Sequence, residues 1–225
     1  MELDELVRLY PRLYHMAAPD AWPQIVRHGL LSTEALLDRF EVAEPQRTEL
    51  LTRRRAVSVT ISHPEHGTAV VRDNIPLSES KLAAALADMT VDQWLRLLNS
   101  KVFFWLQRER VSRLLGAHAY RASSHLIITV DTQLLLGHIG DDSVTLSRIN
   151  TGSTAYRAAP RGRDTFKKIS DYPHPPRRRA LKSASDIAEL SVAGAVADIL
   201  SVAEYADLHT PDGTQLVWKR EPEAT

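Results

Sequence analysis

Short strands and short helices follow one another irregularly along this chain, and this irregularity limits the fold more than any other feature. The clearest strand is the apolar run 125–130, and the run 101–105 is a second, aromatic one. A helix over 91–98 lies before it, where Thr90 and Gln93 form a capping box. A doubly wound α/β protein would show a regular alternation of strand and helix. The pattern instead predicts the α+β class, with antiparallel-rich sheets and flanking short helices.

The composition favours one soluble domain over 1–225. The chain has 225 residues, 44% of them apolar, which suffices for a core without cross-links. It contains 28 Lys plus Arg and 28 Asp plus Glu, so its net charge of zero does not indicate a general nucleic-acid-binding coat. The absence of cysteine excludes disulfides, thiolate metal sites and cysteine nucleophiles.

Location and metal content are predicted from what the sequence lacks. The acidic start Met-Glu-Leu-Asp-Glu is unlike a signal peptide, and no apolar run approaches the roughly 18 residues of a spanning helix. We therefore expect a cytoplasmic protein without a membrane partner. His63 and His66 lie three positions apart, but no HExxH pattern accompanies them, so we expect no metal. The sequence also has no P-loop and no GxGxxG motif.

The first motif lies between residues 13 and 31. Residues 13–16 are predicted to form a strand, and Asp20 is placed to cap a two-turn helix that ends at Gly29. The remaining predicted helices cover 2–10, 33–40, 78–88, 108–116 and 131–136, and the remaining predicted strands cover 57–61, 69–72 and 144–149.

The second motif is near the other end of the chain. Glu189 begins the apolar strand 189–192, and a further strand, 196–200, is predicted after Gly194, with a last strand at 216–218. The segment 150–185 before Glu189 is rich in Gly, Pro, Ser and Arg. A stretch of this length without predicted elements is usually functional or mobile.

Together these motifs resemble the DarT-type nucleic-acid ADP-ribosyltransferases. That family begins with a Tyr-His strand and a short helix ending in Gly-x-Leu, then has an aromatic strand followed by an arginine, and last a catalytic glutamate on a strand. The matching residues here are Tyr14-His15, Gly29-Leu30-Leu31, Val102–Trp105 with Arg108, and Glu189–Val192, in the same order. Residues 150–153 and 159–162 look closer to an uncharacterised relative group.

The resemblance implies an activity and a cofactor site. It implies two packed sheets around an NAD cleft, and transfer of ADP-ribose from NAD to a nucleic-acid base, with loss of nicotinamide. Cleavage of the nicotinamide–ribose bond gives an oxocarbenium-like centre that Glu189 would stabilise. His15 would contact the cofactor ribose, Tyr14 would also bind the cofactor, and Arg108 would bind the diphosphate. Of Phe104 and Trp105, only one can face the cleft, because side chains alternate along a strand.

The resemblance also implies how the acceptor is chosen. In ADP-ribosyltransferases the segment before the catalytic glutamate helps to select the target, so Arg157, Arg161, Arg163 and Arg177 are expected to bind substrate. The expected partners are NAD, a nucleic-acid acceptor and, for a toxin, an antitoxin or immunity protein. The basic clusters 53–55 and 177–179 have the charge to contact a phosphate backbone.

Other interpretations stay open at this point. The same fold can serve as a catalytically inactive module that binds NAD, ADP-ribose or a protein. An NAD-dependent RNA 2′-phosphotransferase-like enzyme would also use several Arg and His residues. The aromatic run 103–105 is equally typical of a core, and Arg108 is equally typical of a solvated helix face.

Overall fold

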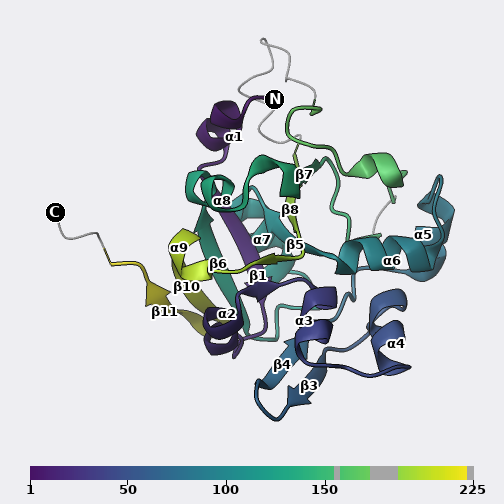
Figure 1. Cartoon of the computed structure of the whole chain (residues 1–225), viewed down its shortest axis with the longest axis horizontal. Coiled ribbons are helices and arrows are strands. Elements are labelled where there is room, and N and C mark those ends of the chain that lie inside the picture. Colours follow the sequence, from purple (N-terminus) through teal and green to yellow (C-terminus); the bar gives the residue numbers. More distant parts are fainter. Residues whose placement is uncertain (155–157, 173–186, 222–225) are drawn as a thin grey trace.

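A seven-stranded antiparallel sheet forms the centre of the protein (Figure 1). The computed structural model describes residues 1–154, 158–172 and 187–221. The strand order is β11-β10-β6-β1-β5-β8-β7, so the N-terminal strand lies in the middle of the sheet. The strands are β1 (Arg12–Ala17), β5 (Lys101–Trp105), β6 (His125–Asp131), β7 (Val144–Ser147), β8 (Glu189–Ala193), β10 (Ala203–Thr210) and β11 (Gly213–Lys219).

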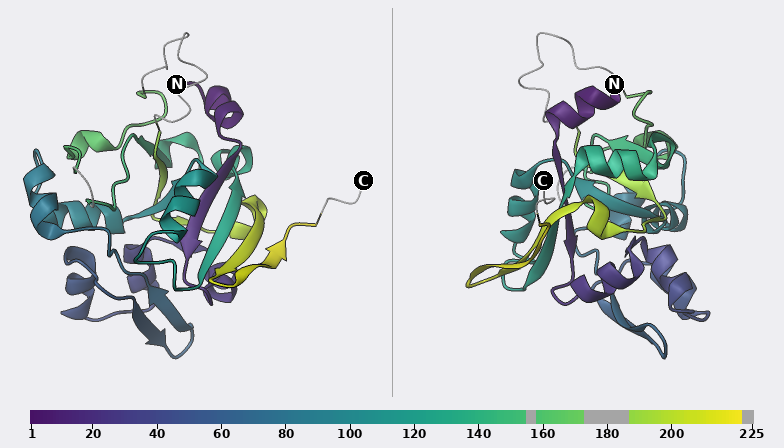
Figure 2. Two further views of the ribbon diagram at one scale, coloured as in Figure 1. Left: turned by 180° about the vertical axis from the view of Figure 1, so that it is seen from behind. Right: turned by 60° about the vertical axis from the view of Figure 1, so that its left-hand side comes forward.

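Helices cover both faces of this sheet (Figure 2). The largest core cluster joins one face to α1 (Leu3–Leu9), α2 (Trp22–His28), α8 (Thr132–Ile139) and α9 (Ile199–Val202). On the other face, Val111 of α7 (Arg108–Leu115) packs against Met16 and Ile127. No helix in the described part of the chain is both long and apolar enough to cross a membrane.

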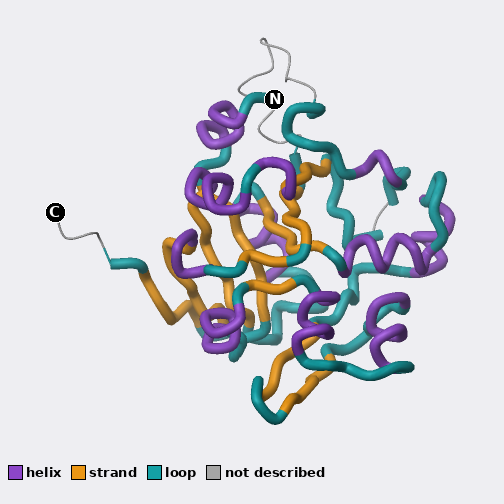
Figure 3. The backbone as a smooth tube through the Cα atoms, in the orientation of Figure 1, coloured by secondary structure: helices purple, strands orange, loops and turns teal. Residues whose placement is uncertain are grey.

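Two smaller groups of elements lie beside the sheet (Figure 3). The first has its own core around Leu37, Phe40 and Leu51. It comprises α3 (Thr33–Arg39), α4 (Gln46–Thr52) and the two-stranded ribbon of β3 (Val59–His63) and β4 (Gly67–Val71). The second is built around the buried Trp94 and comprises α5 (Glu79–Ala85) and α6 (Val91–Asn99). The short strands β2 (Leu30–Leu31) and β9 (Ala195–Val196) form another ribbon, and η1 (Asp141–Ser143) and η2 (Arg163–Thr165) are single 3₁₀ turns.

The contact between β1 and β5 is brief. These strands share one register pair, Tyr14 with Trp105, whereas β1 pairs with β6 along all 6 of its residues. The two halves of the sheet therefore meet at a narrow junction, and the first motif lies on one side of it while Glu189 lies on the other.

The structure confirms the α+β class and most of the expected elements, including the capping box of Thr90 and Gln93. The expectation of two packed sheets is wrong, because β10 and β11 extend one sheet instead of forming a second. The strand expected at 196–200 is also wrong in part. Its second half is α9, since the Asp198 side chain accepts a hydrogen bond from the Ser201 N–H and caps a helix there. At α2, the N-cap is Ala21 and not Asp20.

We predict that Gly29→Ala destabilises the protein far more than Gly140→Ala. Both glycines end a helix with positive φ, at 84° and 80°. A Cβ at Gly29 would lie 2.7 Å from the carbonyl oxygens of Val196 and Ala197, whereas nothing lies within 4 Å of one at Gly140. Urea unfolding should give a loss of about 1 kcal/mol at Gly140 and about 3 kcal/mol or more at Gly29. Equal losses would contradict the close approach of α2 and β9.

Candidate functional site

A cavity of about 570 Å³ lies where the sheet meets α2, α3 and the β3–β4 ribbon. Its lining includes His15 of β1 and Glu189 of β8, which come from opposite ends of the sequence. Cavities of roughly 300–1,000 Å³ are typical of small-molecule sites. Both motifs of the sequence therefore contribute residues to the wall of one cavity.

Glu189 lines this cavity, and one of its two carboxylate oxygens is bound by Thr151. The side chain is only 4% exposed, and Oε2 accepts hydrogen bonds from Thr151, at 3.0 Å from the backbone N–H and 2.7 Å from the hydroxyl. Oε1 has no hydrogen-bond partner among the described residues. Burial raises the pKa of Glu189 to about 7, against the opposing effects of Thr151 and of the Arg110 and Arg161 charges.

His15 is a neutral hydrogen-bond acceptor on β1, which β5 separates from the strand of Glu189. Burial lowers its pKa to about 4, so the ring is uncharged at neutral pH. Its Nδ1 lies 2.8 Å from the carbonyl oxygen of Phe103. A carbonyl only accepts hydrogen bonds, so Nδ1 carries the proton and Nε2 keeps its lone pair. The ring edge of His15 also contacts Phe104, at 5.8 Å between centroids.

Two arginines, Arg55 and Arg72, add positive charge to the cavity wall. Arg72 donates from Nη1 to the Met16 carbonyl at 3.1 Å, and its guanidinium carbon lies 5.6 Å from the centre of the Tyr120 ring. Its Nε and Nη2 have no hydrogen-bond partner among the described residues. Arg55 is tied to the carbonyl of Arg72 and to Asn99, and burial lowers its pKa to about 10, so it stays charged at neutral pH. A guanidinium with unused donors in a cavity suits a phosphate oxygen.

Only part of the expected cofactor site is found at the cavity. Trp105 lines it and is the register partner of Glu189, whereas Phe104 is fully buried in the core. Tyr14 and Arg108 lie outside its lining, although Tyr14 packs in the same cluster under α7 as Trp105. There the guanidinium of Arg108 sits 6.0 Å above the Tyr14 ring and donates to the Tyr205 hydroxyl at 3.4 Å. Arg108 therefore lies away from this cavity, and its contact with a bound diphosphate stays a prediction, whereas Arg72 is an arginine of the cavity wall.

The expected substrate arginines also divide. Arg161 is 3% exposed and donates hydrogen bonds to backbone carbonyls. This burial differs from the expectation that its side chain binds the acceptor. Arg163 is exposed on η2 and outside the cavity lining. Arg157 and Arg177 lie outside the described residues.

The histidines do not assemble a metal site in the part of the chain that the structure describes. His63 and His66 stack at 4.5 Å, and His28 contacts His66, but no three side chains of His, Cys, Asp or Glu there have an arrangement that holds a metal ion.

Comparison with known proteins gives a family without a known activity. Residues 11–203 match a family of unknown function, DUF7002. The chain belongs to DUF7002. The matched region runs from the residue before β1 to the first residue of β10, so it contains His15, Arg55, Arg72 and Glu189. No curated protein matches this DUF7002 chain.

The buried carboxyl group predicts a pH-dependent stability difference between the wild type and Glu189→Gln. Because folding raises the pKa of Glu189 from 4.5 to about 7, the wild type loses stability as the pH rises through this range. Glutamine stays neutral and keeps an acceptor for Thr151. The free energy of unfolding of Glu189→Gln should therefore exceed that of the wild type above about pH 7, by up to about 3 kcal/mol, and match it near pH 4.5.

Chemical unfolding between pH 4.5 and 8 measures this difference. Glu109→Gln, at an exposed position on α7, is the control and should follow the wild-type curve at every pH. Parallel curves for Glu189→Gln and the wild type would show that Glu189 is not a buried, raised-pKa carboxyl.

Proposed function

We propose that this DUF7002 protein transfers ADP-ribose from NAD to an acceptor, a nucleic-acid base, with release of nicotinamide. The observation that carries the proposal is the pairing of Glu189 and His15 at one cavity, the first with an unused carboxylate oxygen and the second with an unprotonated Nε2.

These two groups suit the chemistry of the transfer. NAD supplies the ADP-ribosyl group, as the bond from ribose C1′ to nicotinamide breaks with its electron pair going to nicotinamide, and the acceptor atom bonds C1′ and loses a proton. Oε1 of Glu189 stabilises the positive charge that develops on the ribose and is placed to take that proton. Nε2 of His15 accepts a hydrogen bond from a ribose hydroxyl, and its neutral ring adds no positive charge beside the ribose.

The rest of the cavity wall fits the remaining parts of NAD. Arg72 presents unused guanidinium donors for the diphosphate, with the charged Arg55 attached behind it. Trp105 is the register partner of Glu189 and lines the cavity, which supports a role for its ring in stacking on the nicotinamide.

One observation favours a second candidate, an RNA 2′-phosphotransferase-like reaction that also consumes NAD. Arg55, Arg72 and His15 together line the cavity, and such a reaction needs several cationic and imidazole groups around a phosphate. Binding without catalysis is the third outcome that an experiment must separate.

Incubation of the protein with NAD labelled in its adenylate part, and with separate pools of DNA, RNA and protein, tests the proposal. We expect label on one nucleic-acid pool and release of nicotinamide, both reduced at least about 100-fold in Glu189→Gln. Removal of an RNA 2′-phosphate would support the second candidate. Intact NAD that still raises the melting temperature would mean a binding module, and unchanged turnover in Glu189→Gln would remove Glu189 from the catalytic role.

A matched pair of variants tests the cofactor site. Arg72→Gln should raise KM for NAD about tenfold, since it removes a guanidinium aimed at the diphosphate. Arg108→Gln, which alters an arginine outside the cavity, should leave KM within about twofold of the wild type. Steady-state nicotinamide release measures both. A larger rise in KM for Arg108→Gln than for Arg72→Gln would indicate that Arg108 binds the diphosphate.

A further inference from the structure

Arg161 is a buried cation whose donors go to the backbone of its own segment. Its side chain is 3% exposed and lies 5.9 Å from the centre of the Trp94 ring. Nη1 donates to the carbonyls of Thr151 at 3.0 Å and Ser153 at 3.1 Å, and Nε donates to the carbonyl of Ala159 at 3.1 Å. One guanidinium thus binds two stretches of backbone that lie on either side of residues 155–157. Burying a charge is costly, so such a group is retained where its hydrogen bonds fix a geometry.

The backbone that Arg161 holds is the one that holds Glu189. The carbonyl of Thr151 accepts a hydrogen bond from Arg161, and both the N–H and the hydroxyl of Thr151 donate to Oε2 of Glu189. Arg161 is therefore connected to the carboxylate through a single residue. Two donors on the same oxygen restrict the rotation of the carboxyl group and leave Oε1 without a partner among the described residues.

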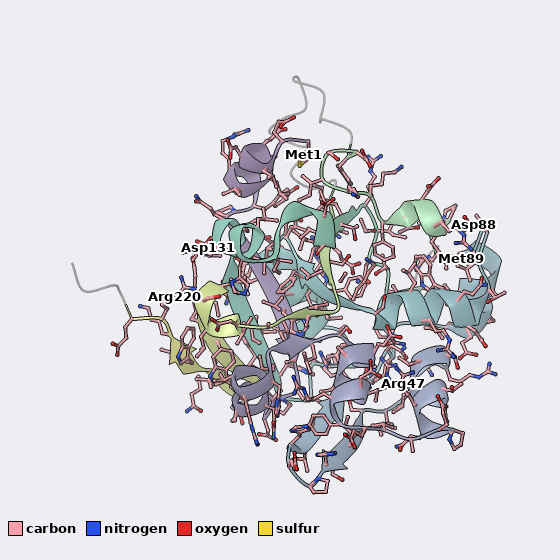
Figure 4. All side chains as sticks on the ribbon, viewed as in Figure 1. Met1, Arg47, Asp88, Met89, Asp131 and Arg220 are labelled. Carbon is pink, nitrogen blue, oxygen red and sulfur yellow. The ribbon has the colours of Figure 1, made fainter. Side chains whose placement is uncertain are left out.

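The far end of this segment is fixed to the group of α5 and α6. The backbone of Arg161 exchanges hydrogen bonds with α5 and the residues after it, from its N–H to Ala85 at 2.9 Å and from Ala87 to its carbonyl at 3.0 Å. Next to it, a Cβ on Gly162 would clash with Oδ1 of Asp88, and that oxygen accepts a hydrogen bond from the Arg163 N–H at 3.1 Å. Figure 4 labels Asp88 beside the short turn η2. The segment that binds the Glu189 carboxylate is thus anchored to α5 and the residues after it, which lie outside the sheet of Glu189.

We propose that Arg161 is a positioning residue that, through Thr151, aims the free oxygen of Glu189 at the ribose of the bound substrate. The catalytic consequence rests on the proposed function, whereas the positioning of the carboxyl group does not. This role replaces the acceptor contact expected from the sequence, since a side chain spent on backbone carbonyls does not reach an acceptor.

The test compares Arg161→Met with Arg163→Met, a control at an exposed arginine of the same segment. The first measurement is a ¹³C NMR titration of the glutamate carboxyl carbons of the full chain without NAD, with the Glu189 signal assigned by its loss in Glu189→Gln. In Arg161→Met the midpoint for Glu189 should move to higher pH, because a nearby cation and the hold on Thr151 are both lost. In Arg163→Met it should stay at the wild-type value.

The second measurement is NAD turnover across pH. Arg161→Met should lower kcat about tenfold at pH 7, with part of the loss recovered at higher pH, while KM for NAD stays within about threefold. Arg161→Lys keeps the charge but not the guanidinium fork, so its kcat should lie between those of the wild type and of Arg161→Met. If Arg161→Met does not fold, Arg161→Lys and Thr151→Val carry both measurements, with shifts in the same direction.

The outcomes separate the two claims. A wild-type Glu189 titration in folded Arg161→Met would overturn the positioning role, as would a kcat that does not change. A shifted titration in a protein that never consumes NAD would retain the positioning role and refute the proposed function.

Discussion

The hydrogen bond from Nδ1 of His15 to the Phe103 carbonyl joins β1 to β5 where their pairing is limited to Tyr14 and Trp105. It fixes the imidazole tautomer, so the nitrogen left for a ligand is an acceptor. It also places the first motif against the half of the sheet that carries β8. Both His15 and Phe103 line the cavity, so this hydrogen bond lies in the cavity wall where the two halves of the sheet meet.

Local signals in the sequence were enough to predict most of the elements. Caps at Thr90 and Asp131, and the glycine stop at Gly29, act within a few residues and so could be recognised without a fold. The errors come from tertiary context. The strand β10 is mixed in polarity and was missed because its stability comes from pairing with β6 and β11 on its two sides. The helix α4 was missed because Leu50 and Leu51 are its main apolar anchors within a polar stretch.

The residues of the candidate site that come from the two ends of the sequence could be predicted, and those from the middle of the sequence mostly could not. His15 and Glu189 belong to motifs that can be compared with a family, and Trp105 was one of two alternatives that strand alternation left open. Arg72 carries no such signal, since a cation after an apolar strand is common and only the packing of the ribbon against Met16 turns it inward. Arg108 lies outside the cavity, and its spacing after β5 could not show this, because that spacing says nothing about which face α7 covers. Arg161 shows the same limit, as sequence alone does not distinguish an exposed loop arginine from a buried one.

We propose that one cavity holds NAD between His15 and Glu189. The most direct measurement is a crystal structure of Glu189→Gln grown with NAD, in which slow turnover preserves the ligand. We expect the nicotinamide ribose to lie between Nε2 of His15 and residue 189, with the diphosphate at Arg72. NAD bound elsewhere on the protein, or a cavity that stays empty at a saturating NAD concentration, would contradict binding between His15 and Glu189.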